Sequence, residues 1–205
     1  MDAVVIQDVS KRFGNTRAVN QLTLSVQPGE ILGFLGTNGA GKTTTIKMLL
    51  GLIVPDGGSI RVLGGDPREA SARSRIGFMP ETAAYYPFLN LHELLFFYGG
   101  LCGMSRAAVR ERADGLIERV GLGAAAGRLL KTYSKGMLQR AGIVQALLHD
   151  PELLILDEPL TGLDPLARIH FRDLILELRE QGKTVFFSSH ELTEAELICD
   201  RVAIL

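Results

Sequence analysis

The sequence has 205 residues, of which 46% are hydrophobic and 22% charged, and its formal net charge at pH 7 is −1. The length suits one domain, or one domain with an inserted subdomain, and the composition is that of a globular chain rather than a disordered one. The near-neutral charge offers no bulk positive field for nucleic acid, so no nucleic-acid partner is expected, although a local basic patch stays open.

Strand-like segments open the chain and recur along it. Val4–Val9 and Leu22–Val26 alternate apolar and polar residues, as half-buried antiparallel strands do. Short continuous apolar runs instead predict strands that are buried on both faces. These runs are Ile31–Leu35, Leu153–Leu156, Val185–Phe187 and Val202–Leu205.

The expected helices carry their own start and stop residues. Thr43–Leu50 follows a glycine-rich loop and reads as a helix. Ser105 is expected to cap a second helix that ends at Gly121, and Asp164 a third that ends before Gly182. A β-rich start, a strand–loop–helix unit, a helical middle and a final strand–helix–strand order together predict an α/β core with a helical insertion.

No segment of the sequence reads as a membrane span or a leader. The N-terminus lacks a basic start followed by a long apolar run, so no signal peptide is expected. The most apolar stretch, Leu94 to Met104, is shorter than the roughly 20 residues that a spanning helix needs. Cys102 and Cys199 lie outside any C-x-x-C pattern and are expected to be reduced thiols.

Residues 36–43 fit the pattern G-x-x-x-x-G-K-[ST] between an expected strand and an expected helix. Glycines let backbone N–H groups point at phosphate oxygens, and the helix N-terminus adds a partial positive charge. Lys42 is expected to meet the β- and γ-phosphates, and Thr43 to ligate Mg²⁺. The alternative is an accidental glycine-rich turn. The predicted nucleotide-binding residues here are Gly36, Thr37, Asn38, Gly39, Ala40, Gly41, Lys42, Thr43 and Thr44.

Two carboxylates follow the apolar run that begins at Leu153. Asp157 comes where parallel sheets place their ligands, and it is expected to hold Mg²⁺ directly or through water. Glu158 is then placed to act as the general base that polarises an attacking water. The alternative is a solvated loop glutamate.

Three further motifs narrow the class of protein. Residues 133–137 read Tyr-Ser-Lys-Gly-Met at the start of a helix, residues 161–164 read Thr-Gly-Leu-Asp, and His190 follows an apolar strand. With the phosphate loop and the acidic strand, these motifs resemble those of ABC ATPases over essentially the whole chain. Residues 134–137 resemble the family's signature, usually written L-S-G-G-Q.

The resemblance implies an α/β fold of the ABC ATPase type. Such a fold has a P-loop NTPase core, an N-terminal antiparallel β subdomain and an inserted helical subdomain. In this chain, residues 1–86 and 151–205 would form the nucleotide-binding core of one ABC ATPase domain. Residues 87–150 would form the helical signature subdomain.

The resemblance also implies that two cassettes pack head to tail, with a homodimer expected. ATP on one phosphate loop would be covered by the signature of the second copy, and Asp164 would be a further nucleotide-binding residue at that contact. A serine-capped helix start is by itself an anion site, which agrees with this arrangement, although a plain helix cap is the alternative. The predicted nucleotide-binding residues of the signature are Ser134, Lys135, Gly136 and Met137.

Two more residues take their roles from the resemblance. His190 would hydrogen-bond the γ-phosphate and hold Glu158 and the water in place; the alternative is a structural histidine. Phe13 would stack on adenine, an interaction that tolerates any base, and the alternative is a plain core aromatic. Lys42, Glu158 and His190 are therefore the predicted catalytic residues.

The chain departs from the family's pattern at three positions. Glu81 stands where the family usually has glutamine; it can still accept hydrogen bonds and reach Mg²⁺ or its water, so it stays a predicted nucleotide and metal ligand. Lys135 and Met137 replace a glycine and a glutamine. These variants resemble cassettes of bacterial exporters, and the family usually continues with further strands and helices after the position of Leu205.

The expected function is ATP hydrolysis, with ATP and Mg²⁺ as cofactors, that powers an ABC transporter, an exporter. The chain would sit in the cytoplasm on the inner face of the cell membrane and bind a separate transmembrane permease subunit. Tyr85, Tyr86 and Phe88 would receive that subunit, and Leu94–Tyr98 would be core of the helical insertion. The alternative is a soluble ABC ATPase acting on ribosomes or DNA.

Overall fold

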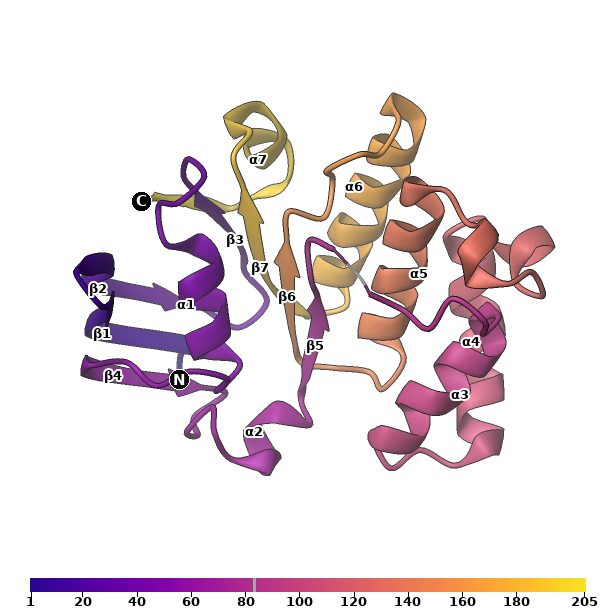
Figure 1. Ribbon diagram of the computed structural model, residues 1–205, viewed down its shortest axis with the longest axis horizontal. Coiled ribbons are helices and arrows are strands. Elements are labelled where there is room, and N and C mark those ends of the chain that lie inside the picture. Colours follow the sequence, from indigo (N-terminus) through magenta and orange to yellow (C-terminus); the bar gives the residue numbers. More distant parts are fainter. Residues whose placement is uncertain (83) are drawn as a thin grey trace.

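The computed structural model describes residues 1–82 and 84–205 and confirms the predicted α/β fold. Figure 1 shows a three-stranded sheet, a five-stranded sheet beside it, and helices stacked beyond the second sheet. Helix α1 (Lys42–Leu49) lies between the two sheets and shares one apolar core with them. The loops that carry the predicted site residues lie at one end of the larger sheet.

The smaller sheet is antiparallel, as the alternating pattern predicts. Its strands lie in the order β2 (Thr16–Val26), β1 (Val4–Phe13) and β4 (Gly57–Val62). Val4, Ile6 and Val9 of β1 are buried in the core that α1 shares, and an irregularity in the strand pairing between Ile6 and Val9 interrupts the alternation. Strand β4 was not predicted, because it is short and begins with two glycines, which strands rarely contain.

The larger sheet is parallel, so the carboxyl ends of its strands meet at one edge. In spatial order it contains β5 (Ile76–Met79), β6 (Leu153–Asp157), β7 (Thr184–Ser189), β3 (Ile31–Leu35) and β8 (Arg201–Ile204). Leu153 and Ile155 of β6 join the core on one face, and Leu154 and Leu156 join the core on the other. Burial on both faces explains why β6 is continuously apolar.

Two of the strands differ from expectation. The prediction that Val202–Leu205 is buried on both faces is wrong, because β8 is the edge strand and Ile204 is 74% exposed. Strand β5 was missed because it has four residues, one of them Gly77. A side chain at Gly77 would start 2.3 Å from the carbonyl oxygen of Ala146, so the close approach of α5 requires glycine there.

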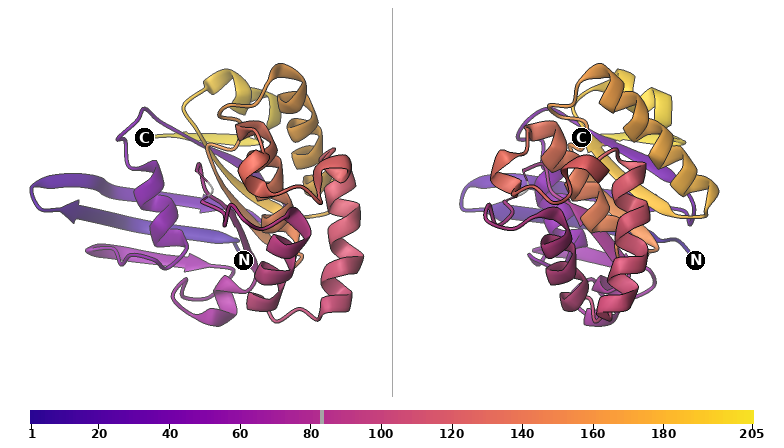
Figure 2. Two further views of the ribbon diagram at one scale, coloured as in Figure 1. Left: turned by 45° about the vertical axis from the view of Figure 1, so that its right-hand side comes forward. Right: turned by 90° about the vertical axis from the view of Figure 1, so that its right-hand side faces the viewer.

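Helices from the second half of the chain cover the face of the parallel sheet opposite α1 (Figures 1 and 2). Helices α5 and α6 pack on that face, and α3 and α4 form a further core with α5. Short helices complete the chain. The bounds are α2 (Ala70–Arg73), α3 (Leu91–Leu101), α4 (Arg106–Arg119), η1 (Gly123–Ala125), η2 (Leu130–Thr132), α5 (Lys135–Leu147), α6 (Pro165–Glu180) and α7 (Leu192–Ile198).

The predicted helix caps are confirmed. The Ser105 hydroxyl accepts a hydrogen bond from the N–H of Ala108 at 3.2 Å, and the Asp164 carboxylate accepts one from Ala167 at 2.9 Å. Cys102 and Cys199 are both free thiols. In residues 1–82 and 84–205, no helix combines the length and the apolar character that crossing a membrane would require.

Candidate active site

The phosphate loop connects β3 to α1 at the carboxyl edge of the parallel sheet. Gly39 and Gly41 have φ angles of 86° and 108°, which lie in the left-handed region that residues other than glycine rarely adopt. A Cβ at Gly41 would also lie 2.3 Å from the carbonyl oxygen of Ala18 in β2. The two glycines therefore fix the loop shape and let β2 approach the start of α1.

The loop encloses a cavity of about 150 Å³. The start of α1 opens into it, so unpaired N–H groups and the positive end of the helix dipole face the same space. Gly36 and Ala40 are the two remaining residues of the predicted loop. The cavity is lined by Ala18, Thr37, Asn38, Gly39, Gly41, Lys42, Thr43, Thr44, Glu81 and Glu158. It thus brings together the predicted phosphate-loop residues, Glu81 and the predicted base.

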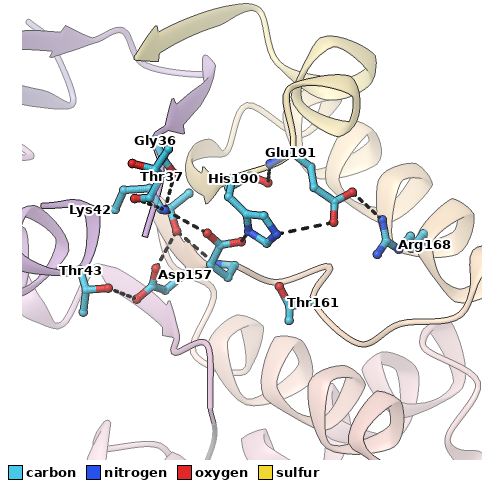
Figure 3. Close-up of polar contacts among 12 residues, drawn as sticks. Gly36, Thr37, Lys42, Thr43, Asp157, Thr161, Arg168, His190 and Glu191 are labelled. Atoms are coloured by element: carbon cyan, nitrogen blue, oxygen red, sulfur yellow. Dashed lines mark hydrogen bonds and ion pairs between the residues drawn. The ribbon is translucent and has the colours of Figure 1, made fainter. Parts of the chain in front are cut away.

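Lys42 is buried, with 6% of its surface exposed, and its ammonium group is surrounded by oxygens. The Nζ atom donates to the carbonyl oxygens of Gly36 at 2.6 Å and Thr37 at 3.4 Å (Figure 3). It also lies 3.2 Å from Oε1 of Glu158. A buried ammonium needs such partners, and phosphate oxygens are of the same kind.

Thr43, which lines the cavity, lies beside Asp157. The Thr43 hydroxyl lies 3.4 Å from Oδ2 of Asp157, while Oδ1 of Asp157 accepts a 2.6 Å hydrogen bond from the Ser188 hydroxyl. A hydroxyl and a carboxylate oxygen side by side fit Mg²⁺, a hard cation with octahedral oxygen ligands. In the described part of the chain, no three His, Cys, Asp or Glu side chains cluster as a metal site.

Glu158 sits on strained backbone directly after β6. Its φ is 49°, uncommon for a residue other than glycine, and such strain concentrates at functional sites. Its N–H is held by Ser188 through the carbonyl oxygen at 3.2 Å and the hydroxyl at 3.0 Å. One carboxylate oxygen, Oε2, pairs with Nδ1 of His190 at 2.8 Å. The other, Oε1, makes no hydrogen bond among the described residues but is ion-paired with Lys42, and the Glu158 side chain belongs to the cavity lining.

Sequence reasoning missed two residues that hold this site together. The Ser188 hydroxyl links Asp157 to the backbone of Glu158 and is fully buried. The predicted strand stopped at Phe187, although a polar residue that continues a buried strand is itself a signal. Gln139 is also buried, and its Nε2 donates to the carbonyl oxygens of Glu81 at 3.2 Å and Thr161 at 3.3 Å.

The signature residues lie apart from the cavity. Within the part of the chain that the structure describes, Ser134, Lys135, Gly136 and Met137 are absent from the cavity lining. The Ser134 hydroxyl caps α5 by accepting from the N–H of Met137 at 3.3 Å. The stem of Lys135 packs beside Gly162, and Asp164 caps α6. One chain therefore carries two separate candidate anion sites.

Phe13 and the aromatic segment after Glu81 differ partly from expectation. Phe13 is 52% exposed, so its interpretation as a core residue is wrong; Lys11 Nζ lies 5.6 Å from its ring centroid. Tyr86 and Phe88 are exposed, but Tyr85 is largely buried, which raises the pKa of its hydroxyl and contradicts its expected place on a docking surface. The core expectation for Leu94–Tyr98 holds for Leu94 and Leu95, and is wrong for the exposed Phe97.

Comparisons with known proteins agree with this geometry. The family model described as ABC transporter matches residues 19–161. The linearmycin resistance ATP-binding protein LnrL of Bacillus subtilis (strain 168) is 41% identical over 201 residues, covering 97% of this chain and 65% of that protein. The bacitracin transport ATP-binding protein BcrA of Bacillus licheniformis is 43% identical over 201 residues, covering 97% of this chain and 65% of that protein.

Two further matches extend these findings. An uncharacterized ABC transporter ATP-binding protein, sll0415 of a Synechocystis species, is 47% identical over 92% of this chain and 54% of its own length. The chain thus spans between about half and two thirds of these curated relatives. A solved ATP binding subunit of an ABC transporter is 34% identical, with a TM-score of 0.91 over 99% of this chain and 85% of that one.

Proposed function

The chain belongs to the ABC transporter family, and from that premise we propose that it is the ATP-binding, ATP-hydrolysing subunit of a membrane transporter. The observation that carries this proposal is the charged group at the carboxyl ends of the parallel strands. There Lys42 and Glu158 line the cavity of the phosphate loop, and His190 pairs with the Glu158 carboxylate. A cation, a carboxylate base and a helix start around one small cavity match the chemistry of a triphosphate.

ATP binding would use the phosphate loop, with Lys42 on the β- and γ-phosphates. Phosphate oxygens would take the place of the carbonyl oxygens that Lys42 now contacts. The exposed ring of Phe13 is available to stack on adenine. We propose that Thr43, Asp157 and Glu81 hold Mg²⁺ directly or through water. Bound Mg²⁺ would neutralise charge on the phosphate oxygens.

For hydrolysis, Glu158 is the proposed general base. A water oxygen would form a bond to the γ-phosphorus while the bond between that phosphorus and the bridging oxygen breaks, which yields ADP and phosphate. The water proton would pass to the carboxylate of Glu158, which belongs to the cavity lining. His190 would hold the carboxylate through Oε2 and reach the γ-phosphate, and Lys42 would stabilise the transferring group.

The signature is proposed to act on the nucleotide of a second, head-to-tail copy. Its residues Ser134, Lys135, Gly136 and Met137 stand at a helix start away from their own chain's cavity. That helix start is a positive dipole end with capped but exposed N–H groups, which suits a triphosphate. Asp164 lies on the neighbouring loop and would border the same contact. Two such sandwiches would favour the closed homodimer.

The transport role is proposed from relatives that share this site. Proteins named for bacitracin transport, linearmycin resistance and Nod factor export are 41–43% identical to the chain. We propose an exporter whose ATPase lies on the inner face of the cell membrane, bound to a separate multi-span subunit. Residues 87–150 would form the subdomain that faces this partner, with Phe88 on its exposed surface and the exposed Tyr86 directly before it. Loss of the γ-phosphate would be sensed at Glu81 and passed to that surface.

Glu158→Gln tests the catalytic proposal. The amide keeps the size of the side chain but cannot take a proton, so turnover should fall by about 100-fold or more while ATP binding persists. Glu152→Gln is the matched control, because Glu152 directly precedes the same strand and pairs with Arg75 at its opposite end. Steady-state hydrolysis and a binding titration check both variants. Unaltered turnover in Glu158→Gln would remove Glu158 from the role.

Affinity capture of the full protein from native membranes tests the transport proposal. We expect a polytopic membrane subunit to co-purify, since the described residues contain no spanning helix of their own. Recovery of ribosomal proteins or DNA in place of such a subunit would support the alternative of an ABC ATPase that acts on ribosomes or DNA.

A further inference from the structure

Arg168, in the first turns of α6, joins two loops that border the catalytic group. Its Nη1 donates to Glu191 Oε2 at 2.9 Å and to Glu194 Oε1 at 3.2 Å. Its Nε donates to the carbonyl oxygen of Leu163 at 3.4 Å. One guanidinium therefore ties the loop before α6 to the segment that carries His190.

Glu191 connects Arg168 to His190. It follows His190 directly, and its Oε1 lies 3.9 Å from Nε2 of the ring, the nitrogen that does not face Glu158. Glu191 also occupies the cap position of α7, but its side chain makes no capping bond; it reaches Arg168 instead. Figure 3 shows His190, Glu191 and Arg168 in one line that leads away from Asp157 and Lys42.

The imidazole of His190 needs such support, because 45% of its side chain is exposed. An exposed ring has few packing contacts to fix its rotamer, so polar partners on both nitrogens must do so. Arg168 also neutralises two carboxylates, those of Glu191 and Glu194. Without it, the Glu191 carboxylate would lose its anchor, and Nε2 of His190 would lose the charged group that lies 3.9 Å from it.

We propose that Arg168 and Glu191 are a positioning pair that holds His190 against Glu158 and couples this contact to the loop at Leu163. This inference rests on the proposed ATPase function and deepens it by naming a regulatory connection. Because Leu163 lies in the segment that a second copy would border, a shift of that loop moves the guanidinium. The guanidinium in turn moves the segment that carries His190. Assembly of two cassettes would then set the angle of the histidine.

The test compares Arg168→Gln with Arg172→Gln. Arg172 lies one turn later on α6 and approaches Glu194 only, at 4.0 Å, so it is a matched control. Arg168→Gln should lower kcat by about 10-fold or more, because small misplacement of a catalytic group has large effects, while KM and ATP affinity stay unchanged. Arg168→Lys should recover part of the loss, since it keeps the charge but cannot span both loops.

Further readouts separate positioning from a general loss of structure. In the nucleotide-free protein, the ¹⁵N resonances of the His190 ring should shift in Arg168→Gln and stay in place in Arg172→Gln. Glu191→Gln should lower kcat in the same way, and the double variant should lose no more than the larger single effect. Should Arg168→Gln fail to fold, Glu191→Gln carries the test alone.

The outcomes also separate this inference from the proposed function. Unchanged kcat and unchanged His190 resonances in Arg168→Gln and Glu191→Gln, with Glu158→Gln slow, would overturn the inference and leave the ATPase proposal standing. A lower melting temperature with unchanged kcat per folded molecule would reduce the pair to a structural role. Normal turnover in Glu158→Gln would instead overturn the proposed function itself.

Discussion

The phosphate cradle and the signature end of α5 are both built on helix starts, yet they differ in what surrounds them. The cradle comprises residues 36–43 with Asp157 and Glu158, and its charged groups are buried and paired within the chain. The signature end comprises residues 134–137, and its first residues are exposed around a single serine cap. The groups of the cradle are thus brought together within one chain. The signature end is proposed to act on the nucleotide of a second copy, because it lies apart from the cavity of its own chain.

Gly136→Asp has the largest expected effect and tests whether the signature end acts on the nucleotide of a second copy. The new carboxylate in the first turn of α5 should stabilise the helix by about 0.3–1 kcal/mol through its dipole, so the fold should persist. A Cβ there meets Leu163 only at ordinary contact distance, 3.5 Å. If the signature end faces a second copy's triphosphate, the added negative charge should reduce turnover by about 100-fold. ATPase assays and thermal unfolding check both effects.

Two controls accompany this variant. Gly136→Ala adds the Cβ without the charge and should keep most of the turnover. A mixture of Gly136→Asp with Lys42→Ala should regain activity, because one of the two sites in a mixed dimer combines an intact cradle with an intact signature end. Full activity of Gly136→Asp, or no recovery in the mixture, would contradict the assignment of the two regions to different chains.

The sequence predicted the cradle better than its surroundings, for physical reasons. Phosphate binding demands glycines, a lysine and a hydroxyl at fixed spacing, so neighbouring residues specify the loop of the cradle, residues 36–43. The contacts of Ser188 and Gln139 depend instead on the pairing of β6 with β7 and on the packing of α5, which join distant segments. Local pattern cannot report such pairing. The same limit applies to β5 and β8, whose burial depends on their places in the sheet.

Phe13→Ala tests whether an exposed residue outside the cradle stacks on the adenine of the nucleotide that the cradle binds. Losing a stacked aromatic should weaken ATP binding by about 1–3 kcal/mol, between roughly 5-fold and 150-fold in Kd. Since the ring is 52% exposed, the melting temperature should change little. Phe13→Tyr keeps the stacking surface and should bind normally. Unchanged ATP affinity in Phe13→Ala would show that the base lies elsewhere.

The smallest expected effects are those of removing two buried hydroxyls, one beside α5 and one beside the cradle. The Tyr85 hydroxyl is buried beside α5 without a hydrogen-bond partner among residues 1–82 and 84–205, so removing it relieves a desolvation penalty. Tyr85→Phe should therefore raise the free energy of unfolding by about 1 kcal/mol. Ser188→Ala should lower it by about 1–3 kcal/mol, because Asp157 and the N–H of Glu158 lose a buried partner. Denaturant unfolding of both variants checks the opposite signs. Equal losses would mean that the polar groups beside α5 are as fully satisfied as those of the cradle.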